Sequence, residues 1–332
     1  MNSPFTDKPM KLLLIEKAEV FRKEEFLIVQ HSYLCEDTQE EIVSSKQLHI
    51  NIEQLHNAYR AKHNIPSASS IRRIREQYGI SAAKMSELME FGINTYKQYE
   101  EGDIPSLPNA RLIRKIAAQP LEFKKQVEES QVIKEKDKQE LLVRIEGLIN
   151  AADANIETEL LNTLITTRPD ITTGYARLNP LKFLNMIAFF AEKTAPFKTK
   201  LNKLLFYADF LHFKKQGISI SGAKYRAIQY GPVPADYQLL YGFASSKEFV
   251  EIEEKIFNDN TNVSEKFKKG TYGFDSSLFE ASEIETLQEI NDFFEKFNAK
   301  KIIEFSHKEK AWKENEELYN LIDYNYAFNL GI

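Results

Sequence analysis

Residues 199–237 limit the possible folds of this 332-residue chain more than any other stretch. Their first half repeats apolar residues at spacings of three and four, which places those residues on one face of a helix. The residues on this face are Leu201, Leu204, Leu205, Ala208 and Leu211. Because three aromatic residues widen the face, we expect a well-buried helix that ends at Gly217.

The second half of the stretch predicts a short strand over residues 225–230, because its side chains alternate loosely between apolar and polar. Residues 231–234 read Gly-Pro-Val-Pro. Proline cannot donate a hydrogen bond to a neighbouring strand, so the chain is expected to leave the strand at this point. A following helix is expected to begin near Asp236 and Tyr237.

Three segments of the chain carry a resemblance to a known family. They are K-L-x-K-L-L-F-Y-A-D at residues 200–209, Y-G-P-V-P-x-D-Y at 230–237 and S-H-x-E-x-A-W at 306–312. In this order they resemble the SocA-like family of antitoxins, also called the Panacea domain, over residues 178–332. The resemblance implies a module that binds and neutralises a protein toxin.

The same segments suggest where a toxin would bind. Lys203 and Tyr207 lie one helical turn apart, and residues 230–233 are expected to lie near them. The predicted toxin-binding residues are Lys203, Tyr207, Tyr230, Gly231, Pro232, Val233, Tyr237 and Trp312. The alternative places the aromatic residues in the core and lets Gly231 and Pro232 shape a turn, and for the aromatic residues we favour the core.

Residues 1–64 predict a small β domain. Residues 10–34 form two apolar runs around a polar turn, which indicates a hairpin, and residues 47–62 have the spacing of a short helix. Joined to the next segment, this arrangement is similar to the MqsA family of antitoxins, in which a zinc-binding domain precedes a helix-turn-helix. A structural zinc needs four Cys or His ligands. Because only His31 and Cys35 resemble remnants of such a set, we predict a zinc-ribbon-like β domain without metal.

Residues 65–119 predict a helix-turn-helix with one additional helix. Ser69 or Ser70 is expected to cap the first helix, which ends at Gly79, and Ser81 is expected to cap the second. Side-chain oxygens at these positions can accept the backbone N–H groups that the first helical turn leaves unpaired.

The third helix of this unit is predicted over residues 94–101 and the fourth over residues 110–118. The inward residues of the fourth helix are expected to be Leu112, Ile113 and Ile116. The agreement of turn, cap and core positions resembles the Xre-type helix-turn-helix, specifically its MqsA form.

The third helix is expected to enter the major groove of DNA. Its outward residues are Asn94, Thr95, Lys97 and Gln98. Asn94 and Gln98 can pair with adenine edges, at positions where the MqsA-like motif places base readers, and Lys97 can reach a phosphate or guanine. The candidate phosphate contacts are Arg72, Arg73, Arg75 and Ser81. The alternative is a helix-turn-helix kept only for dimer packing.

Residues 120–177 are highly charged with both signs, and an apolar stripe runs from Leu141 to Leu164. This pattern predicts a connector made of one long helix or a helical pair. The stripe is either a dimer seam or a packing surface for the next domain, and both remain open. Arg168, Pro169 and Asp170 end the segment at the clearest domain boundary in the chain.

The rest of residues 178–332 predicts an α-rich domain with a small inserted β-sheet. Residues 249–257 predict an edge strand, and Ser282 with Glu285 predicts a capping box before an amphipathic helix. One last helix is expected to carry Ile302, Phe305 and Trp312. Together with the N-terminal hairpin and the helix-turn-helix, these elements predict an α+β chain that is mostly α.

Composition and motifs narrow the classes of protein to which this chain can belong. The single cysteine excludes an intrachain disulfide and is typical of a reducing cytoplasm, and no apolar run is long enough for a membrane span. No nucleophile elbow or glycine-rich phosphate loop is present, so neither an enzyme nor a cofactor is predicted. Asp209 is expected to pair with Lys203 or Arg226.

The net charge of −5 is distributed in blocks of opposite sign. Residues 180–230 hold 9 Lys and Arg against 2 Asp and Glu, whereas residues 231–332 hold 11 against 20. Such blocks either neutralise each other or offer complementary patches to a charged partner.

The sequence therefore predicts the antitoxin of a toxin–antitoxin pair. Its C-terminal domain would bind a toxin encoded nearby, and its helix-turn-helix would bind the operator of its own operon, as a cytoplasmic homodimer that acts by occlusion. Two alternatives stay open. One is an adaptor that delivers a toxin to a protease, and the other is a prophage-type DNA-binding transcription regulator.

Overall fold

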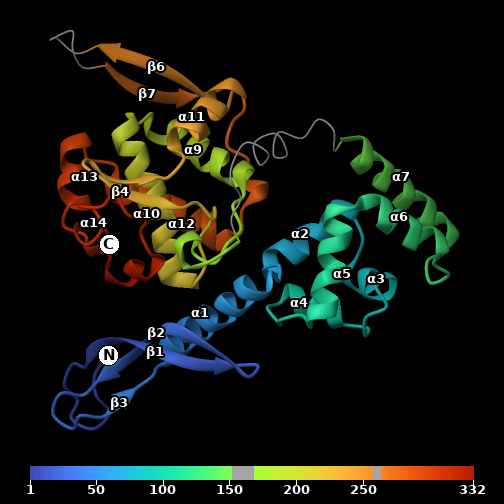
Figure 1. Cartoon of the computed structure of the whole chain (residues 1–332), viewed down its shortest axis with the longest axis horizontal. Helices are drawn as coiled ribbons and strands as arrows, with labels where there is room; N and C mark the ends of the chain where they lie inside the picture. The colour runs from blue at the N-terminus through green and yellow to red at the C-terminus, as the bar shows by residue number, and fades with distance from the viewer. Residues whose placement is uncertain (152–167, 257–262) are drawn as a thin grey trace. The chain divides into compact units, whose positions relative to one another are not determined.

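The computed structural model describes residues 1–151, 168–256 and 263–332 (Figure 1). Backbone contacts distinguish two compact units, residues 1–58 with 166–332 and residues 59–165. The described residues are mostly helical with small antiparallel sheets, which confirms the predicted α+β, mostly α class. None of the described helices combines the length and the apolar character needed to cross a membrane.

The N-terminal hairpin forms as predicted. Its strands are β1 (Lys11–Phe21) and β2 (Glu24–Leu34), and the short β3 (Glu41–Ile42) pairs with the end of β2. Both residues of the turn between β1 and β2 have positive φ, the geometry of the tight turns that match the twist of paired strands. The helix expected after the hairpin is α1 (Ser45–His63).

One edge of β2 is paired with β3 only at the end of β2. Along the rest of that edge, amide side chains of α1 form hydrogen bonds with backbone N–H and carbonyl groups of β2. Asn51 accepts from the N–H of His31 at 2.8 Å and donates to its carbonyl at 3.0 Å. Gln54 does the same for Val29, at 3.0 and 2.9 Å. A bare strand edge offers such groups to other chains, so α1 closes this edge.

The hairpin and α1 also pack on C-terminal residues within the same unit. The Asn57 side chain donates to the carbonyl of Gly217 at 3.1 Å, and the His31 ring meets Phe328 edge-on with ring centroids 4.4 Å apart. His31 and Cys35 are both buried. In the described part of the chain, no group of three or more His, Cys, Asp or Glu residues could hold a metal ion.

The second unit begins at Tyr59, within the last turns of α1. Its helices are α2 (Ala68–Tyr78), α3 (Ala82–Leu88), α4 (Thr95–Glu100), α5 (Leu107–Ala118), α6 (Pro120–Glu129) and α7 (Glu135–Ala151). Gly79 ends α2 with φ 66° and Ser81 caps α3, as predicted. The predicted cap of α2 is wrong, because Ser67, rather than Ser69 or Ser70, lies at the N-cap and accepts the N–H of Ser70.

Helix α5 begins earlier than predicted. Ser106 caps it, and Pro108 lies in its first turn, where the missing N–H has no helical partner in any case. Ile113 and Ile116 are buried as expected. Leu112 is 44% exposed, contrary to the prediction, because it lies off the row of residues that faces the core.

An apolar core joins all the helices of this unit from α2 to α7. Residues from α2, α3, α4 and α5 include Ile71, Tyr78, Met85, Leu88, Tyr96, Ile113 and Ile116. Residues from α6 and α7 are Phe123, Val127, Leu141 and Ile145. The described start of the predicted connector is therefore a helical pair that packs on helices α2 to α5. Residues 152–167 of the connector lie outside the described residues.

The C-terminal part of the first unit is arranged around α10 (Lys198–Gln216), which contacts five helices and strands and one 3-10 helix (Figure 1). These neighbours are α9 (Pro180–Thr194), β5 (Gly231–Pro234), β7 (Val263–Lys269), α12 (Ala281–Phe294), α13 (Ala299–Ser306) and the 3-10 helix η4 (Tyr324–Asn329). Every residue of α10 from 201 to 213 is buried, and Gly217 ends the helix with φ 68°, which confirms the prediction.

The chain leaves the predicted strand after Ile228, earlier than expected, but the prolines do not keep residues 231–234 out of the sheet. These residues form β5, which pairs antiparallel with β4 (Tyr225–Ile228). Pro232 and Pro234 face Ala227 and Tyr225, whose backbone groups bond instead to residues 320 and 322 on the other side of β4. Since these two positions of β5 need no N–H donor toward β4, proline is tolerated there.

Two further C-terminal predictions need correction. The capping box of α12 uses Glu280 and Glu283 instead of Ser282 and Glu285, because Glu283 is also held by a buried ion pair with Lys182. The predicted last helix is divided into α13 and α14 (Lys310–Lys313).

The inserted sheet is present as β6 (Val250–Ile256), which pairs antiparallel with β7. Helix α11 (Tyr237–Ser246) begins where expected, after Asp236.

Candidate functional site

The three sequence segments that carry the resemblance meet in the folded chain. The first lies on α10, the second forms the turn and second strand of the β4–β5 hairpin, and the third spans the end of α13 and α14. Contacts join α10 to β5 and α13, and join α14 to β4. We call the residues at this junction, Lys203, Gly231, Ser306, His307 and Trp312, the junction cluster.

Lys203 lies at the centre of the junction cluster and is fully buried. Among the described residues its ammonium group has no hydrogen-bond partner. Burial lowers its pKa from 10.5 to about 7, because a charged amine loses its hydration there. An uncompensated buried charge is costly, so this lysine is an unusual occupant of a core position.

Gly231 covers the lysine. Its φ is 97°, and a Cβ atom on it would lie 2.7 Å from Cε of Lys203 and 2.6 Å from Oγ of Ser306. Glycine is therefore required for two reasons, the positive φ and the close approach of two side chains. The hairpin passes directly over the ammonium group as a result.

His307 and Trp312 form the wall of the cluster beside the hairpin. Their rings stack nearly parallel, with centroids 3.8 Å apart, and Trp312 Nε1 donates to the carbonyl of Ile228 at 2.8 Å. Burial and the positive charge of Lys203 lower the pKa of His307, whereas the charge of Glu316 and contact with the backbone of Gln229 act in the opposite direction. Its Nε2 atom is buried and has no hydrogen-bond partner among the described residues.

Tyr207 and Glu309 close the side of the site toward the C-terminus. The tyrosine donates to the Glu309 carboxylate at 3.2 Å, and the same carboxylate accepts the N–H of Gly331. Burial raises the pKa values of both side chains. This pair links α10 to α14 and leaves Tyr207 with no exposed surface.

Asp209 does not pair with Lys203 or Arg226, contrary to the prediction. Its carboxylate accepts the N–H groups of Ile220 and Ser221 at 2.9 and 2.8 Å. It also accepts the hydroxyls of Ser221 and Tyr225, at 2.5 and 2.7 Å. Burial raises its pKa to about 6 although these four donors act in the opposite direction. Asp209 therefore organises the loop that leads from α10 to β4.

The predicted toxin-binding residues divide into a buried and an exposed set. Lys203, Tyr207, Gly231, Pro232 and Val233 are buried, and Trp312 and Tyr237 are partly buried. Tyr230, at the tip of the hairpin, is 59% exposed.

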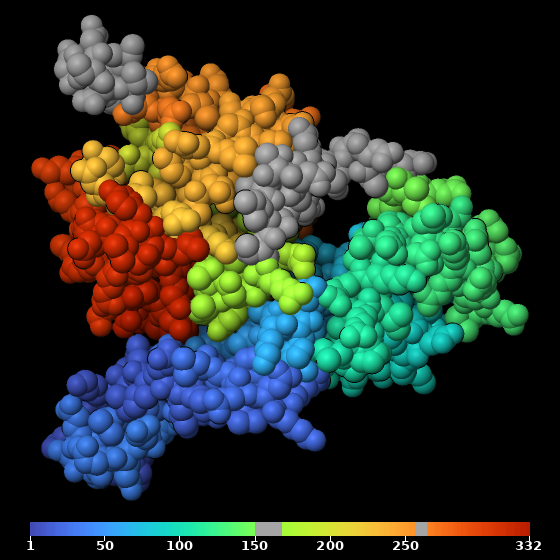
Figure 2. Space-filling model, in the orientation of Figure 1, coloured from blue at the N-terminus to red at the C-terminus, as the bar shows by residue number. Residues whose placement is uncertain are grey.

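In the space-filling view, residues near 225–245 (yellow) and the last thirty residues (red) adjoin on the visible face of this part (Figure 2). Tyr237 lies away from the cluster, against Tyr241 and beneath the ammonium group of Lys198.

Residues 201–313 match the family model described as antitoxin SocA-like, Panacea domain. The match covers about a third of the chain and contains the whole junction cluster. It confirms the C-terminal part of the resemblance and supports an antitoxin role in general. The MqsA-like resemblance of the N-terminal residues stays a prediction. No curated protein matches the chain.

The residues predicted to bind a toxin do not include Ser306, His307 and Glu309, although all three lie in the segment S-H-x-E-x-A-W. The signal that could have found them is the density of polar residues in that segment, together with a lysine on a helix that the sequence predicts to be well buried. Only the fold brings that segment to Lys203.

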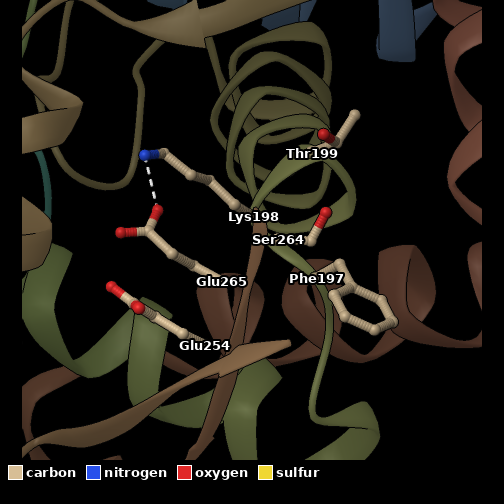
Figure 3. A pocket seen from close by; sticks show the side chains of 6 residues that line it. All are labelled: Phe197, Lys198, Thr199, Glu254, Ser264 and Glu265. Atoms are coloured by element: carbon tan, nitrogen blue, oxygen red, sulfur yellow. Dashed lines mark ion pairs between the residues drawn. The ribbon is translucent and has the colours of Figure 1, made fainter. Parts of the chain in front are cut away.

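The C-terminal part of the first unit also contains a polar pocket of about 340 Å³ (Figure 3). Lys198 reaches Glu265 at 2.5 Å, and the carboxylate of Glu254, which faces Glu265 across β6 and β7, points to the same side. Like charges opposite each other destabilise a strand pair, and the lysine offsets this repulsion. The pocket lies outside the junction cluster.

The predicted DNA-reading residues lie on α4 of the second unit. Asn94, Lys97 and Gln98 are exposed and Thr95 is partly exposed, while Tyr96 and Tyr99 of the same helix are buried. The residues predicted to contact DNA bases therefore lie on the solvent-exposed side of the helix. Lys97 reaches Glu101 at 3.6 Å, an exposed pair that contributes little to stability.

The residues predicted to contact DNA phosphates differ in how far they are already used in hydrogen bonds within the second unit. Ser81 is exposed but already caps α3. Arg72 donates to the carbonyl of Glu100, and Arg73 donates to Ser70. Arg75 bonds to the buried carboxylate of Glu100 at 2.5 Å, so its guanidinium serves the fold.

Proposed function

We propose that this chain is an antitoxin that binds and neutralises a toxin encoded nearby through its Panacea-like region. The observation that carries the proposal is the match of residues 201–313 to the antitoxin SocA-like family. The chain would act by occluding the toxin in the cytoplasm, without catalysis, metal or cofactor.

The binding face on which we base the test is the exposed tip of the β4–β5 hairpin. Tyr230 is large, amphipathic and 59% exposed, and it lies directly before the glycine that covers the junction cluster. Tyrosine is enriched among the residues that dominate binding at protein interfaces. The hairpin tip thus places an exposed tyrosine at the start of the segment Y-G-P-V-P-x-D-Y, which carries part of the resemblance.

Replacing Tyr230 by alanine is expected to weaken toxin binding by about 2 kcal/mol or more, roughly 30-fold, as for an interface anchor. The measurement is growth rescue when the adjacent open reading frame is expressed with the full chain, together with the dissociation constant of the purified pair. Tyr272→Ala is the matched control, because Tyr272 is 60% exposed in the same unit but lies outside the junction cluster. Equal rescue by both variants would remove the hairpin tip from the interface.

The same experiment separates the alternative functions. If the toxin disappears from cells only when this chain and a protease are both present, the chain is a delivery adaptor. If the neighbouring protein is harmless, or the wild-type chain neither binds nor rescues, the transcription regulator is the better description.

The second unit is proposed to bind the operator of the same operon as a homodimer. Asn94 and Gln98 would read bases from α4, with Thr95 and Lys97 beside them, and Arg72, Arg73 and Ser81 would contact phosphates. What supports this is that three of these residues at α4 and its N-cap are exposed and Thr95 is partly exposed, around a buried tyrosine pair.

The double variant Asn94→Ala, Gln98→Ala is expected to weaken binding to the DNA upstream of the gene by about 1–3 kcal/mol for each lost base contact. Lys97→Ala should instead weaken binding to all sequences and lower the salt slope by about 1. Band-shift titrations at two salt concentrations measure both effects. Lys136→Ala, an exposed lysine of the same unit on α7, is the control. Unchanged binding by the double variant would contradict the assignment of base readers to α4.

A further inference from the structure

The junction cluster contains two buried polar atoms that the described chain leaves without a hydrogen-bond partner. They are Nζ of Lys203 and Nε2 of His307. The lysine side chain has no exposed surface, and its charge is close enough to lower the pKa of the histidine. Buried polar atoms are usually paired, so two unpaired ones in the same small cluster indicate a missing partner.

Among the described residues, Asp209 and Glu309 already have partners of their own, and Glu316 acts on His307 by its charge, raising its pKa without a hydrogen bond to either unpaired atom. Asp209, on the same helix as Lys203, already accepts four hydrogen bonds from the loop before β4. Glu309, two residues after His307, already binds Tyr207 and the N–H of Gly331. Both carboxylates are held by partners on other elements, so the described residues supply no carboxylate that bonds to the ammonium group of Lys203.

The chemistry of the two unpaired atoms selects a carboxylate. A lysine ammonium is a compact positive charge with three donors, and a histidine nitrogen can supply one further donor. A carboxylate has two oxygens that accept hydrogen bonds from both, and ionic hydrogen bonds of this kind are about twice as strong as neutral ones. A hydroxyl or amide would leave the ammonium charge uncompensated.

We propose that Lys203 and His307 form a recognition site for a carboxylate of the toxin partner, an acidic side chain or the C-terminal group. This inference rests on the proposed antitoxin function and identifies the chemistry of its binding face. The ligand reaches the site when the exposed tip at Gln229 and Tyr230 moves aside, since Gly231 lies directly over the lysine.

Calorimetric titration of the full-length chain with the protein encoded beside it tests the site. Lys203→Met keeps the shape of the side chain and removes its charge, and it is expected to weaken binding at least tenfold while the melting temperature stays unchanged or rises. His307→Phe keeps the stacking on Trp312 and removes the nitrogen, and it should also weaken binding. Lys300→Met, an exposed lysine on α13, is the charge-matched control and should bind like the wild type.

A small free carboxylate, acetate, provides a second test of the site that does not depend on the partner protein. Thermal unfolding of the wild type in sodium acetate and in sodium chloride of equal ionic strength shows whether a small acid enters the site by itself. Stabilisation by acetate that Lys203→Met abolishes supports the site. Loss of partner binding in Lys203→Met without any acetate effect supports a carboxylate that only the partner delivers.

Two results would overturn the inference, and they differ in what they leave standing. If the wild type binds its partner and both Lys203→Met and His307→Phe bind equally well, the carboxylate site is refuted and the antitoxin function survives. If the wild type binds no neighbouring protein and acetate has no effect, the proposed function and the site fail together. Lower stability of Lys203→Met with retained affinity would assign the lysine to the fold alone.

Discussion

The Asp209→Ala variant is expected to lose more than about 4 kcal/mol of unfolding free energy in the first unit, because each buried donor left unpaired costs about 1–3 kcal/mol. Four donors converge on this fully buried carboxylate. Two are backbone N–H groups of the loop after α10, so their loss also releases the path of the chain toward β4. Chemical denaturation followed by circular dichroism measures the effect.

Two further variants serve as comparisons for the loss of unfolding free energy in Asp209→Ala. Asp209→Asn keeps one carbonyl oxygen for the loop and should lose less than the alanine variant. Asp236→Ala removes an exposed aspartate that makes no side-chain cap bond at the start of α11, and its effect should stay within about 0.5 kcal/mol. An Asp209→Ala protein as stable as Asp236→Ala would show that the loop does not depend on the carboxylate.

The Lys203→Met variant is expected to exceed the wild type in stability by a few kcal/mol at pH 7 and below, and by less as the pH rises. In the folded chain burial lowers the pKa of Lys203 from 10.5 to about 7, whereas the unfolded chain keeps the ordinary value. Between these values the unfolded state binds more protons, so the stability of the wild type rises with pH at about 1.4 kcal/mol per unit. Methionine has no proton to bind, so the difference between the two proteins shrinks toward pH 10.

Denaturant unfolding at several pH values from 6 to 10 measures this difference directly. Taking the difference cancels the titration of groups common to both proteins, including the buried tyrosines. Lys300→Met, which removes an exposed lysine, should give a small difference from the wild type at neutral pH. A Lys203→Met protein that is less stable than the wild type throughout this range would mean that the lysine has a stabilising partner in the free chain.

The local pattern of the sequence was sufficient for the main helices and the N-terminal hairpin. Apolar spacing placed α10, and Gly217 marked its end, because a helix that ends in a left-handed residue favours glycine. Ser81 and Gly79 marked the ends of short helices for the same kind of local reason. The convergence of the resemblance segments was expected in part, since Lys203 was predicted to lie near residues 230–233.

Long-range contacts determined the features that were predicted wrongly. Residues 231–234 form a strand because residues 320–322 pair with the other side of β4, a partner that lies far along the sequence. Glu283 becomes part of the capping box because a buried lysine on α9 selects it. Helices α6 and α7 pack on helices α2 to α5 because their apolar faces complete the same core.

The sequence by itself thus determined the main helices and the N-terminal hairpin, because propensity, periodicity and caps act over a few neighbouring residues. Only the tertiary structure decided which polar side chains are satisfied. Asp209 and Lys203 lie on consecutive turns of one helix, yet the first has four donors and the second has no partner among the described residues. The difference arises because the loop at residues 220–225 folds over one and Gly231 closes over the other, and burial removes the water that would have served both.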